Sequence, residues 1–353
     1  MLGGGASGLG GDVAGARGVR AAVFREGSLG VEEWPRPRVA AGELLLRVRG
    51  CGLCGSDIAK LVAGPPPRPL VLGHEVVGDV VDLGSGVGGF AVGDRAVAAH
   101  HVPCGACHYC RRGSASMCRG FKASHLDPGG FAEYVRVPAD NVRHATFRLP
   151  PTIDDEAASF VEPLACCHRA VRRTGAETGD TCVVVGLGSI GCLFVQLLTR
   201  TGAAVVGVDR LPERAEVAKR FGAAAGTTPE AAPAVTRELS DGRGADHVIV
   251  TGGGIAVLGR AAEIVRDGGS IHYFAGGAGD ALPLALQTLY HRELTVTSTY
   301  SSSPADLAAA FELIVSGQVT VNGLISHRLP LERIAEGVDL MRRHQALKVF
   351  VTP

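Results

Sequence analysis

The sequence predicts an α/β protein in which a β-rich part precedes a doubly wound parallel sheet. Between residues 20 and 150, short apolar or alternating runs are separated by glycine and proline, as is typical of strands joined by turns. Between residues 180 and 300, strand-like runs alternate with runs of helical spacing. That alternation predicts parallel strands with helices on both faces of the sheet.

The β-rich part contains five strand-like runs: RAAVF (20–24), ELLLRVRG (43–50), EVVGDVVDLG (75–84), AVGDRAVAA (91–99) and FAEYVRVP (131–138). The later part contains strands predicted at TCVVVGLG (181–188), AVVGVD (204–209), DHVIVTGGG (246–254), GSIHYFAGG (269–277) and ELTVTSTYS (293–301). Two amphipathic helices and a closing strand are predicted after residue 304, at 305–317, 331–344 and 347–353.

Composition excludes several classes of function. Lysine and arginine number 35, and so do aspartate and glutamate, so no net charge favours nucleic acid or a membrane as a partner. The longest apolar run, 182–198, is interrupted by glycine and short for a bilayer span. We expect residues 1–19 to be a disordered leader, since they lack the apolar run of an export signal. The ten cysteines are therefore expected to be reduced, in the cytoplasm.

A glycine-rich turn follows the run TCVVVGLG and opens the next helix. Its glycines, Gly186, Gly188 and Gly191, have the G-x-G-x-x-G spacing of dinucleotide-binding turns. The first permits a tight turn, the second lets a pyrophosphate approach the backbone, and the third lets the helix pack on the strand. The helix start, with Ser189 and Ile190, then faces the phosphates. A glycine-rich turn without a ligand is the alternative.

The next strand-like run ends at Asp209. Its carboxylate can accept both hydroxyls of the adenosine ribose and would repel a 2′-phosphate, so NAD is predicted in preference to NADP. The following residue is Arg210, and an arginine there can pair with a phosphate. Asp209 and Arg210 are both candidate cofactor-binding residues, and NADP stays open.

A short stretch, PCGACHYCRRGSASMC (103–118), has the spacing C-x2-C-x2-C-x7-C. Its cysteines are Cys104, Cys107, Cys110 and Cys118. Two closely spaced pairs of thiols suit tetrahedral zinc, and the spacing fits the usual iron–sulfur patterns poorly. Sites with four thiolates are closed, so we expect a structural zinc. His108 is expected to face solvent, because the thiolates complete the coordination.

A second, dispersed set of metal-binding side chains lies in CGLCGSD (51–57), GHE (73–75) and VEPLACCH (161–168). Cys54, His74 and one carboxylate would supply three protein ligands and leave a fourth position open, as in catalytic zinc sites. The residues alone leave the choice of carboxylate open.

Taken in order, GLCGSD, GHE, the four-cysteine loop, EPLA and GLGSIG resemble the motifs of zinc-dependent medium-chain dehydrogenases, from about residue 20 onward. The resemblance implies about two zinc ions per chain, with Cys54 and His74 on the catalytic one. Glu162 is similar to the acidic ligand of the polyol branch, which includes sorbitol and threonine dehydrogenases. Glu75 resembles a neighbouring glutamate that can exchange onto the metal, and Asp57 a carboxylate that orients the histidine. A diffuse likeness extends to aminocyclitol dehydrogenases.

The resemblance also assigns a proton acceptor. Ser56 stands where the family has a hydroxyl that takes the alcohol proton. Many relatives continue this relay through a histidine five residues after the cysteine ligand, but that position is Ala59, followed by Lys60. The proton is expected to leave through water, with or without help from Lys60 or Glu75; the alternative for Lys60 is a solvated side chain.

Other cysteines and histidines are not expected to bind metal. Cys51, Cys166 and Cys167 are interpreted as buried small hydrophobes, with Cys166 as the alternative to Glu162. The remaining histidines are interpreted as surface or hydrogen-bonded residues, namely His100, His101, His125, His144, His272, His291, His327 and His344.

By the same resemblance, the catalytic domain is a GroES-like, partly open β-barrel over residues 20–163 and 302–353. A Rossmann domain would occupy residues 164–301. Family members associate through an edge strand of that domain, for which ELTVTSTYS is the candidate, so a homodimer or homotetramer is expected. Tyr300 and Ser301 are expected near the substrate hydroxyls, or otherwise at a strand end and turn.

Three functions compete. The favoured one is an NAD-dependent dehydrogenase of a polar secondary alcohol: a polyol, sugar or cyclitol. An NADP-linked reductase of ketones or aldehydes is the rival enzyme, supported by Arg210. A non-catalytic nucleotide-binding protein on a dehydrogenase scaffold would be expected to have lost Cys54, His74 and Glu162, which are all present.

Overall fold

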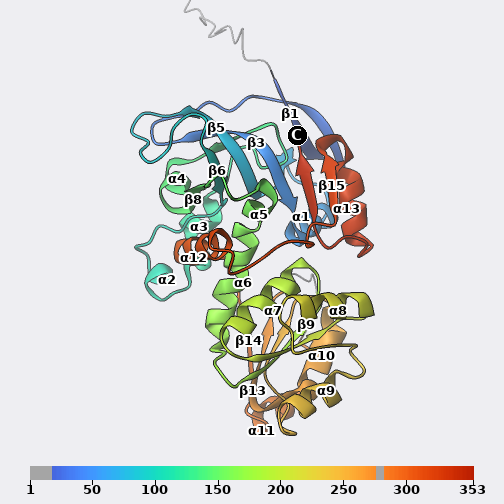
Figure 1. The fold of residues 1–353 in the computed structure, drawn as a ribbon. Helices are drawn as coiled ribbons and strands as arrows, with labels where there is room; N and C mark the ends of the chain where they lie inside the picture. Colours follow the sequence, from blue (N-terminus) through green and yellow to red (C-terminus); the bar gives the residue numbers. More distant parts are fainter. Residues whose placement is uncertain (1–17, 276–281) are drawn as a thin grey trace, which may run out of the picture.

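The computed structural model describes residues 18–275 and 282–353, which form two bodies (Figure 1). The upper body in Figure 1 holds the first part of the chain and its C-terminal end, and the lower body holds the middle. Of the predicted leader, residues 1–19, the first 17 residues lie outside the described part of the chain. Val19 already belongs to strand β1 (Val19–Arg25), so the predicted leader extends too far.

The upper body is built on two β-sheets. Besides β1, their strands are β2 (Ser28–Trp34), β3 (Leu44–Leu53), β4 (Leu70–Val71), β5 (Glu75–Leu83), β6 (Arg95–Ala98), β7 (Tyr134–Val137), β8 (Thr146–Arg148), β15 (His327–Pro330) and β16 (Val349–Thr352). The seven-stranded sheet has the order β15-β16-β3-β5-β6-β8, with β7 on β3, and the three-stranded sheet has the order β2-β1-β4. The C-terminal strand thus pairs with β3, which leads into the GLCGSD motif.

Helices surround these sheets. They are α1 (Gly55–Val62), α2 (His108–Arg111), α3 (Arg119–Ala123), α4 (Ala139–Ala145), α5 (Asp155–Ser159), α6 (Val161–Thr174), α12 (Pro304–Val315) and α13 (Ile334–Arg342), with short 3-10 turns η1 (Ala115–Met117) and η2 (Leu331–Arg333). Helix α6 carries the EPLA motif and runs from the upper body down to the lower one (Figure 1).

The lower body is a parallel sheet with helices around it (Figure 1). Its strands are β9 (Thr181–Val185), β10 (Ala204–Val208), β11 (Ala225–Thr227), β12 (Ala245–Val250), β13 (Val265–Tyr273) and β14 (Thr295–Ser298). Its helices are α7 (Ser189–Arg200), α8 (Pro212–Arg220), α9 (Ala232–Leu239), α10 (Gly254–Ile264) and α11 (Leu286–His291).

The six strands lie in the order β11-β10-β9-β12-β13-β14. All their pairings are parallel. The order reverses between β9 and β12, and ligands of such sheets bind at that reversal, beyond the carboxyl ends of the strands. The predicted doubly wound sheet is confirmed, and β14 is at its edge, as expected for ELTVTSTYS.

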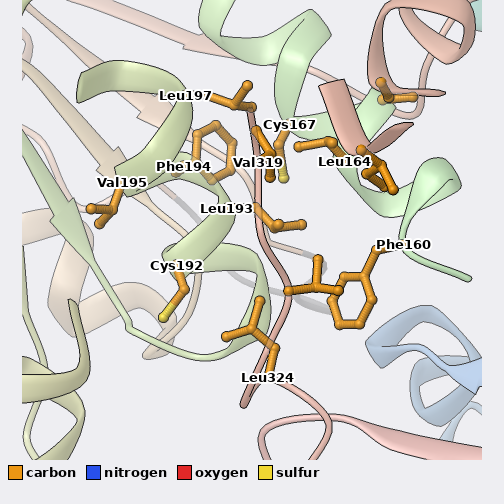
Figure 2. Packing of buried hydrophobic residues seen from close by; sticks show 14 of the residues in the cluster. Phe160, Leu164, Cys167, Cys192, Leu193, Phe194, Val195, Leu197, Val319 and Leu324 are labelled. Carbon is orange, nitrogen blue, oxygen red and sulfur yellow. The ribbon is translucent and has the colours of Figure 1, made fainter. Parts of the chain in front are cut away.

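A continuous apolar core joins the two bodies. Helix α6 packs on both α7 and α12. Figure 2 shows side chains of α6 and α7, including Leu164, Cys167 and Leu193, gathered with Val319 from the returning chain. Leu164 and Leu193 are 0% exposed, and each such burial contributes about 1.5–3 kcal/mol. The junction is therefore packed like a domain interior.

Strand β2 was not predicted. Its sequence, SLGVEEW, contains glycine and two adjacent glutamates, which interrupt the apolar alternation of Leu29 and Val31, although Leu29, Val31 and Trp34 pack against the core. It is held by antiparallel pairing with β1 across a tight turn at Glu26 and Gly27, which have positive φ values of 52° and 83°. Within the described part of the chain, none of the helices has the length and hydropathy needed to cross a bilayer.

Candidate metal centre and active site

The four predicted cysteine ligands converge in space. The Sγ atoms of Cys107 and Cys110 are 3.5 Å apart, as are those of Cys104 and Cys118. The Sγ atoms of Cys104 and Cys110 are 4.0 Å apart, and all four lie within 4.8 Å of one another. All ten cysteines of the chain are free, so this loop holds no disulfide.

The spacing of these sulfur atoms fits a metal ion. Thiolates bound tetrahedrally to zinc at about 2.3 Å have sulfur–sulfur edges of about 3.8 Å, within the range seen here. The backbone N–H of Cys104 lowers the pKa of the Cys118 thiol to about 6, which favours the thiolate form that binds metal. His108 is exposed, as predicted.

A buried arginine ties the four-cysteine loop to the body junction. Arg169, on α6, is 6% exposed. Its guanidinium donates to Gly113 O and Ser116 Oγ of the loop, at 3.1 and 2.9 Å. It also donates to Tyr300 O at 2.8 Å and to Ser301 O at 3.3 Å. The loop and the chain crossing at 300–301 are thus fastened to one helix.

A second group of metal-binding atoms comes from Cys54, His74 and Glu75, whose ligand atoms lie within 4.8 Å of one another. Cys54 precedes α1, His74 precedes β5, and Glu75 begins β5. His74 and Glu75 are buried, while Cys54 is half-buried. One thiol, one imidazole and one carboxylate are a donor set that suits zinc and leaves coordination open to a substrate.

His74 is oriented by Asp57, as expected. The Nδ1 atom of His74 lies 3.3 Å from Asp57 Oδ1, and Asp57 is 0% exposed. Burial disfavours the carboxylate, but His74 and the backbone N–H of Cys54 outweigh it and lower the pKa of Asp57. Nδ1 therefore carries the proton, which leaves Nε2 free to bind a metal. Ser56 Oγ lies 3.5 Å from that Nε2.

Glu75 has a partner that was not predicted. Lys348, just before β16, donates to Glu75 Oε1 at 2.5 Å. A Cβ atom at Gly52 would lie 1.8 Å from Glu75 Oε2 and 2.9 Å from Lys348 Cε. The ion pair therefore occupies space that only glycine leaves open. The sequence feature that could have indicated this buried ion pair is the single lysine in the apolar run ALKVFV.

Glu162 lies close to this group without joining its tightest cluster. It is in the first turn of α6, is 5% exposed, and accepts a hydrogen bond from Cys166 Sγ at 3.5 Å. Burial raises its pKa, with His74 opposing the rise and Glu75 adding to it. Cys51 and Cys167 are core residues at 0% exposure, whereas Cys166 is half-buried and bonded to Glu162.

The glycine-rich turn has the predicted geometry. Gly186 follows β9 at φ 94°, and a Cβ there would lie 2.7 Å from Thr251 Oγ1. A Cβ at Gly191 would lie 2.0 Å from Gly186 O, whereas one at Gly188 would meet nothing within 4 Å. The backbone at Gly188 is therefore open to a ligand, beside the unpaired N–H groups that begin α7 at Ser189 and Ile190.

Asp209 closes the same turn from β10. Its Oδ2 accepts from Leu187 N–H at 2.7 Å, and its Oδ1 accepts from Leu211 N–H at 3.0 Å. Each carboxylate oxygen keeps a further lone pair, so the group can still accept hydroxyls. Arg210 is exposed.

Three histidines interpreted as surface or hydrogen-bonded residues line up beside the metal-binding group. Ring centroids are 4.6 Å apart for His74 and His100, 3.7 Å for His100 and His101, and 5.2 Å for His101 and His125. Burial, with the charges of His74 and Lys60 among its neighbours, lowers the pKa of His100. Burial likewise lowers the pKa of His101 to about 4.

Comparisons with known proteins give the family. Residues 40–147 match the alcohol dehydrogenase GroES-like domain, and residues 189–316 match the zinc-binding dehydrogenase domain. The sorbitol dehydrogenase of Halalkalibacterium halodurans is 31% identical over 334 residues, covering 93% of this chain and 96% of that one. The chain belongs to the zinc-binding alcohol dehydrogenase family.

Solved structures agree with this assignment. The alcohol dehydrogenase of Thermus sp. ATN1 superposes with a TM-score of 0.83 at 31% identity, over 94% of this chain and 99% of that one. A zinc-binding dehydrogenase from Sinorhizobium meliloti bound to NADP gives 0.84 at 30% identity, over 96% and 100%. The predicted α/β fold and alcohol or polyol dehydrogenase class are confirmed.

Proposed function

We propose that this dehydrogenase oxidises a secondary alcohol of a polyol, sugar or cyclitol to a ketone, with NAD as hydride acceptor. The observation that carries the proposal is the convergence of Cys54, His74 and Glu75, with Asp57 orienting the histidine. The likeness to a sorbitol dehydrogenase over nearly the whole chain supports a polyhydroxylated substrate.

Cys54, His74 and Glu162 are the proposed ligands of a catalytic zinc, with Glu75 as the exchange ligand. Glu75 already has the Lys348 ammonium as its counter-charge. The only side chain that bonds to Glu162 among the described residues is the thiol of Cys166. A buried carboxylate without a cation is costly, so a metal is the natural partner for Glu162. When bound, zinc supplies Lewis-acid polarisation of the substrate oxygen.

The side chains around the metal site handle the proton. Ser56 Oγ, beside His74 Nε2, receives the alcohol proton while the hydride leaves the carbinol carbon for the nicotinamide. Ala59 offers no group to carry the proton further. Water therefore takes it from Ser56, and Lys60, exposed on the same helix, is available to assist.

NAD is the proposed cofactor because the Asp209 carboxylate is fixed at the end of β10 by two backbone N–H groups. A 2′-phosphate there would be repelled. Arg210 and the NADP bound to the Sinorhizobium meliloti relative favour the rival NADP-linked reductase. The presence of Cys54, His74 and Glu162 disfavours the non-catalytic alternative.

The remaining expectations are part of the same proposal. The four-cysteine loop holds a second, structural zinc. The domain boundaries are residues 163/164 and 301/302, and the chain forms a homodimer or homotetramer through the exposed edge of β14. The free state of every cysteine supports a reducing compartment such as the cytoplasm.

The test is a screen of the purified, zinc-loaded protein with NAD and NADP against polyols, cyclitols, aminocyclitols, sugar phosphates and simple alcohols. NAD-dependent ketone formation from polyols is the expected result. Turnover with NADP alone would favour the reductase, and no turnover in either direction by a protein holding about two zinc ions would contradict both.

A further inference from the structure

A pocket at the foot of the lower body lies apart from the proposed dehydrogenase site. It is formed where β12 and β13 begin, between the ends of α9 and α10 and the residue that follows α11, near the bottom of Figure 1. The glycine turn follows the carboxyl end of β9, which is parallel to β12. The pocket and the dinucleotide turn are therefore at opposite edges of the sheet.

Charged side chains dominate the lining of this pocket, which we call the arginine pocket. They are Arg237, Arg243, Arg266, Arg292, Glu263 and Asp267. Four guanidinium groups against two carboxylates leave an excess of two positive charges. None of the lining residues that the structure describes is aromatic, so a nucleotide base has no ring to stack on. The volume, about 470 Å³, is that of a small-molecule site.

Two of the four arginines are held in place by the protein. Arg292 donates to two backbone carbonyl oxygens, of the last turn of α10 and the first residue of β13, at 2.6 and 2.7 Å. Its Nε donates to Asp267 Oδ1 at 2.6 Å. Arg266 Nε donates to Asp246 Oδ1 at 2.5 Å. Because these guanidinium groups are already ordered, a ligand that binds them loses little affinity to their immobilisation.

The other two arginines have most of their donors unused. Arg237, exposed in the last turn of α9, forms no ion pair with any residue that the structure describes. Arg243 pairs with Asp241 at 3.2 Å, but the side chain of Asp241 is 90% exposed, so solvent weakens the pair. Guanidinium groups bind phosphate oxygens through paired N–H donors, and these two are available for that purpose.

A glycine brings Arg243 to the pocket. The next residue, Gly244, has a φ of 96°, in the left-handed region that favours glycine. A Cβ atom there would lie 2.9 Å from the carbonyl oxygen of Ile264 and 3.2 Å from the backbone nitrogen of Arg266. The loop that carries Arg243 can therefore approach the start of β13 only because residue 244 lacks a side chain.

We propose that the arginine pocket binds a phosphorylated polyol or sugar. The guanidinium groups bind the phosphate, while Glu263 and Asp267 accept hydrogen bonds from the hydroxyl groups of the ligand. The same two carboxylates repel a bare phosphate ion, so they favour a phosphate ester that carries hydroxyls. This binding site goes beyond the proposed dehydrogenase function and requires no turnover.

The experiment is calorimetric titration of sorbitol 6-phosphate into the zinc-loaded protein saturated with NADH, which blocks the dinucleotide site. Inorganic phosphate is the comparison ligand. The wild-type protein should bind sorbitol 6-phosphate about tenfold more tightly than inorganic phosphate, as expected for added hydrogen bonds. Arg237→Gln/Arg243→Gln should weaken the binding of sorbitol 6-phosphate by about tenfold or more, because charge-assisted hydrogen bonds are lost.

The matched control is Arg220→Gln/Arg260→Gln, which removes the same charge from exposed arginines of α8 and α10 outside the pocket. It should bind sorbitol 6-phosphate as the wild type does. Glu263→Gln should lower the preference for sorbitol 6-phosphate over inorganic phosphate severalfold, since the repulsion of the bare ion is reduced.

Equal affinities of the wild type and Arg237→Gln/Arg243→Gln for sorbitol 6-phosphate would overturn the inference. So would equal weakening in the two double variants, which would mean attraction by overall charge. Inorganic phosphate bound as tightly as the ester would contradict the role of the carboxylates. Binding is measured without turnover, so these results do not depend on whether the proposed reaction is correct.

Discussion

Lys348 Nζ lies 2.5 Å from Glu75 Oε1, and the two residues are 2% and 0% exposed. The pair joins the C-terminal chain to the start of β5, next to His74. Because Gly52 leaves the room that both side chains occupy, three separate segments of the sheet depend on each other.

Lys348→Met should destabilise the protein by about 3–5 kcal/mol, because it leaves a buried carboxylate without its cation. Urea unfolding measures this. The matched control is the double variant Lys348→Met/Glu75→Gln, which removes both charges and should recover part of the loss. Glu75→Gln alone completes the cycle. If the losses in free energy of unfolding of the two single variants add up to that of the double variant, the pair is not coupled.

Cys107→Ser should lower the zinc content from about two ions to about one per chain. The thermal midpoint should fall, while kcat per folded molecule stays within a few-fold, because the four-cysteine loop is closed to substrate. His108→Gln, one residue away and exposed, is the control and should leave the metal content unchanged. Loss of zinc from that control would refute the four-thiolate site.

Arg169→Gln should loosen the four-cysteine loop from α6, because several hydrogen bonds to Gly113, Ser116 and residues 300–301 depend on its guanidinium. Each lost bond costs about 0.5–1.5 kcal/mol. Zinc should leave faster into a chelator. Arg173→Gln, exposed on the same helix, is the control; equal release rates in the two variants would argue against this role.

Asp209→Ser should shift cofactor preference toward NADP, since it removes the charge that opposes a 2′-phosphate and the acceptor of the ribose hydroxyls. We expect the ratio of kcat/KM for NAD to that for NADP to fall by about 100-fold, the effect of roughly 2.7 kcal/mol. Arg210→Met should move the ratio the other way. An unchanged ratio in Asp209→Ser would mean that other groups select the cofactor.

The sequence predicted those features that depend on local chemistry. The glycine turn at 186–191 and the four-cysteine loop lie within short motifs, so their spacing alone was informative. The pairing of Asp57 with His74 joins two separate motifs, and it was expected only from the family resemblance. The doubly wound sheet followed from the alternation of runs along the chain.

The features that were missed depend on pairing between distant segments. His100 meets His74 because β5 and β6 are antiparallel with Val76 opposite Ala98, which brings residue 100 level with residue 74. Without that register, the sequence did not indicate which residue His100 and its neighbour His101 would contact. Lys348 reaches Glu75 only through the pairing of β16 with β3 and of β3 with β5.

The most direct test of the central claim is the pair Cys54→Ala and Cys107→Ser, assayed for zinc content and for NAD-dependent oxidation of sorbitol. Cys54→Ala should keep the structural zinc and the fold, and lose about 10³-fold or more in kcat, the scale of Lewis-acid stabilisation. Cys107→Ser should instead lose the structural zinc and keep kcat within a few-fold of the wild type. Full turnover by Cys54→Ala would contradict the assignment of the catalytic metal.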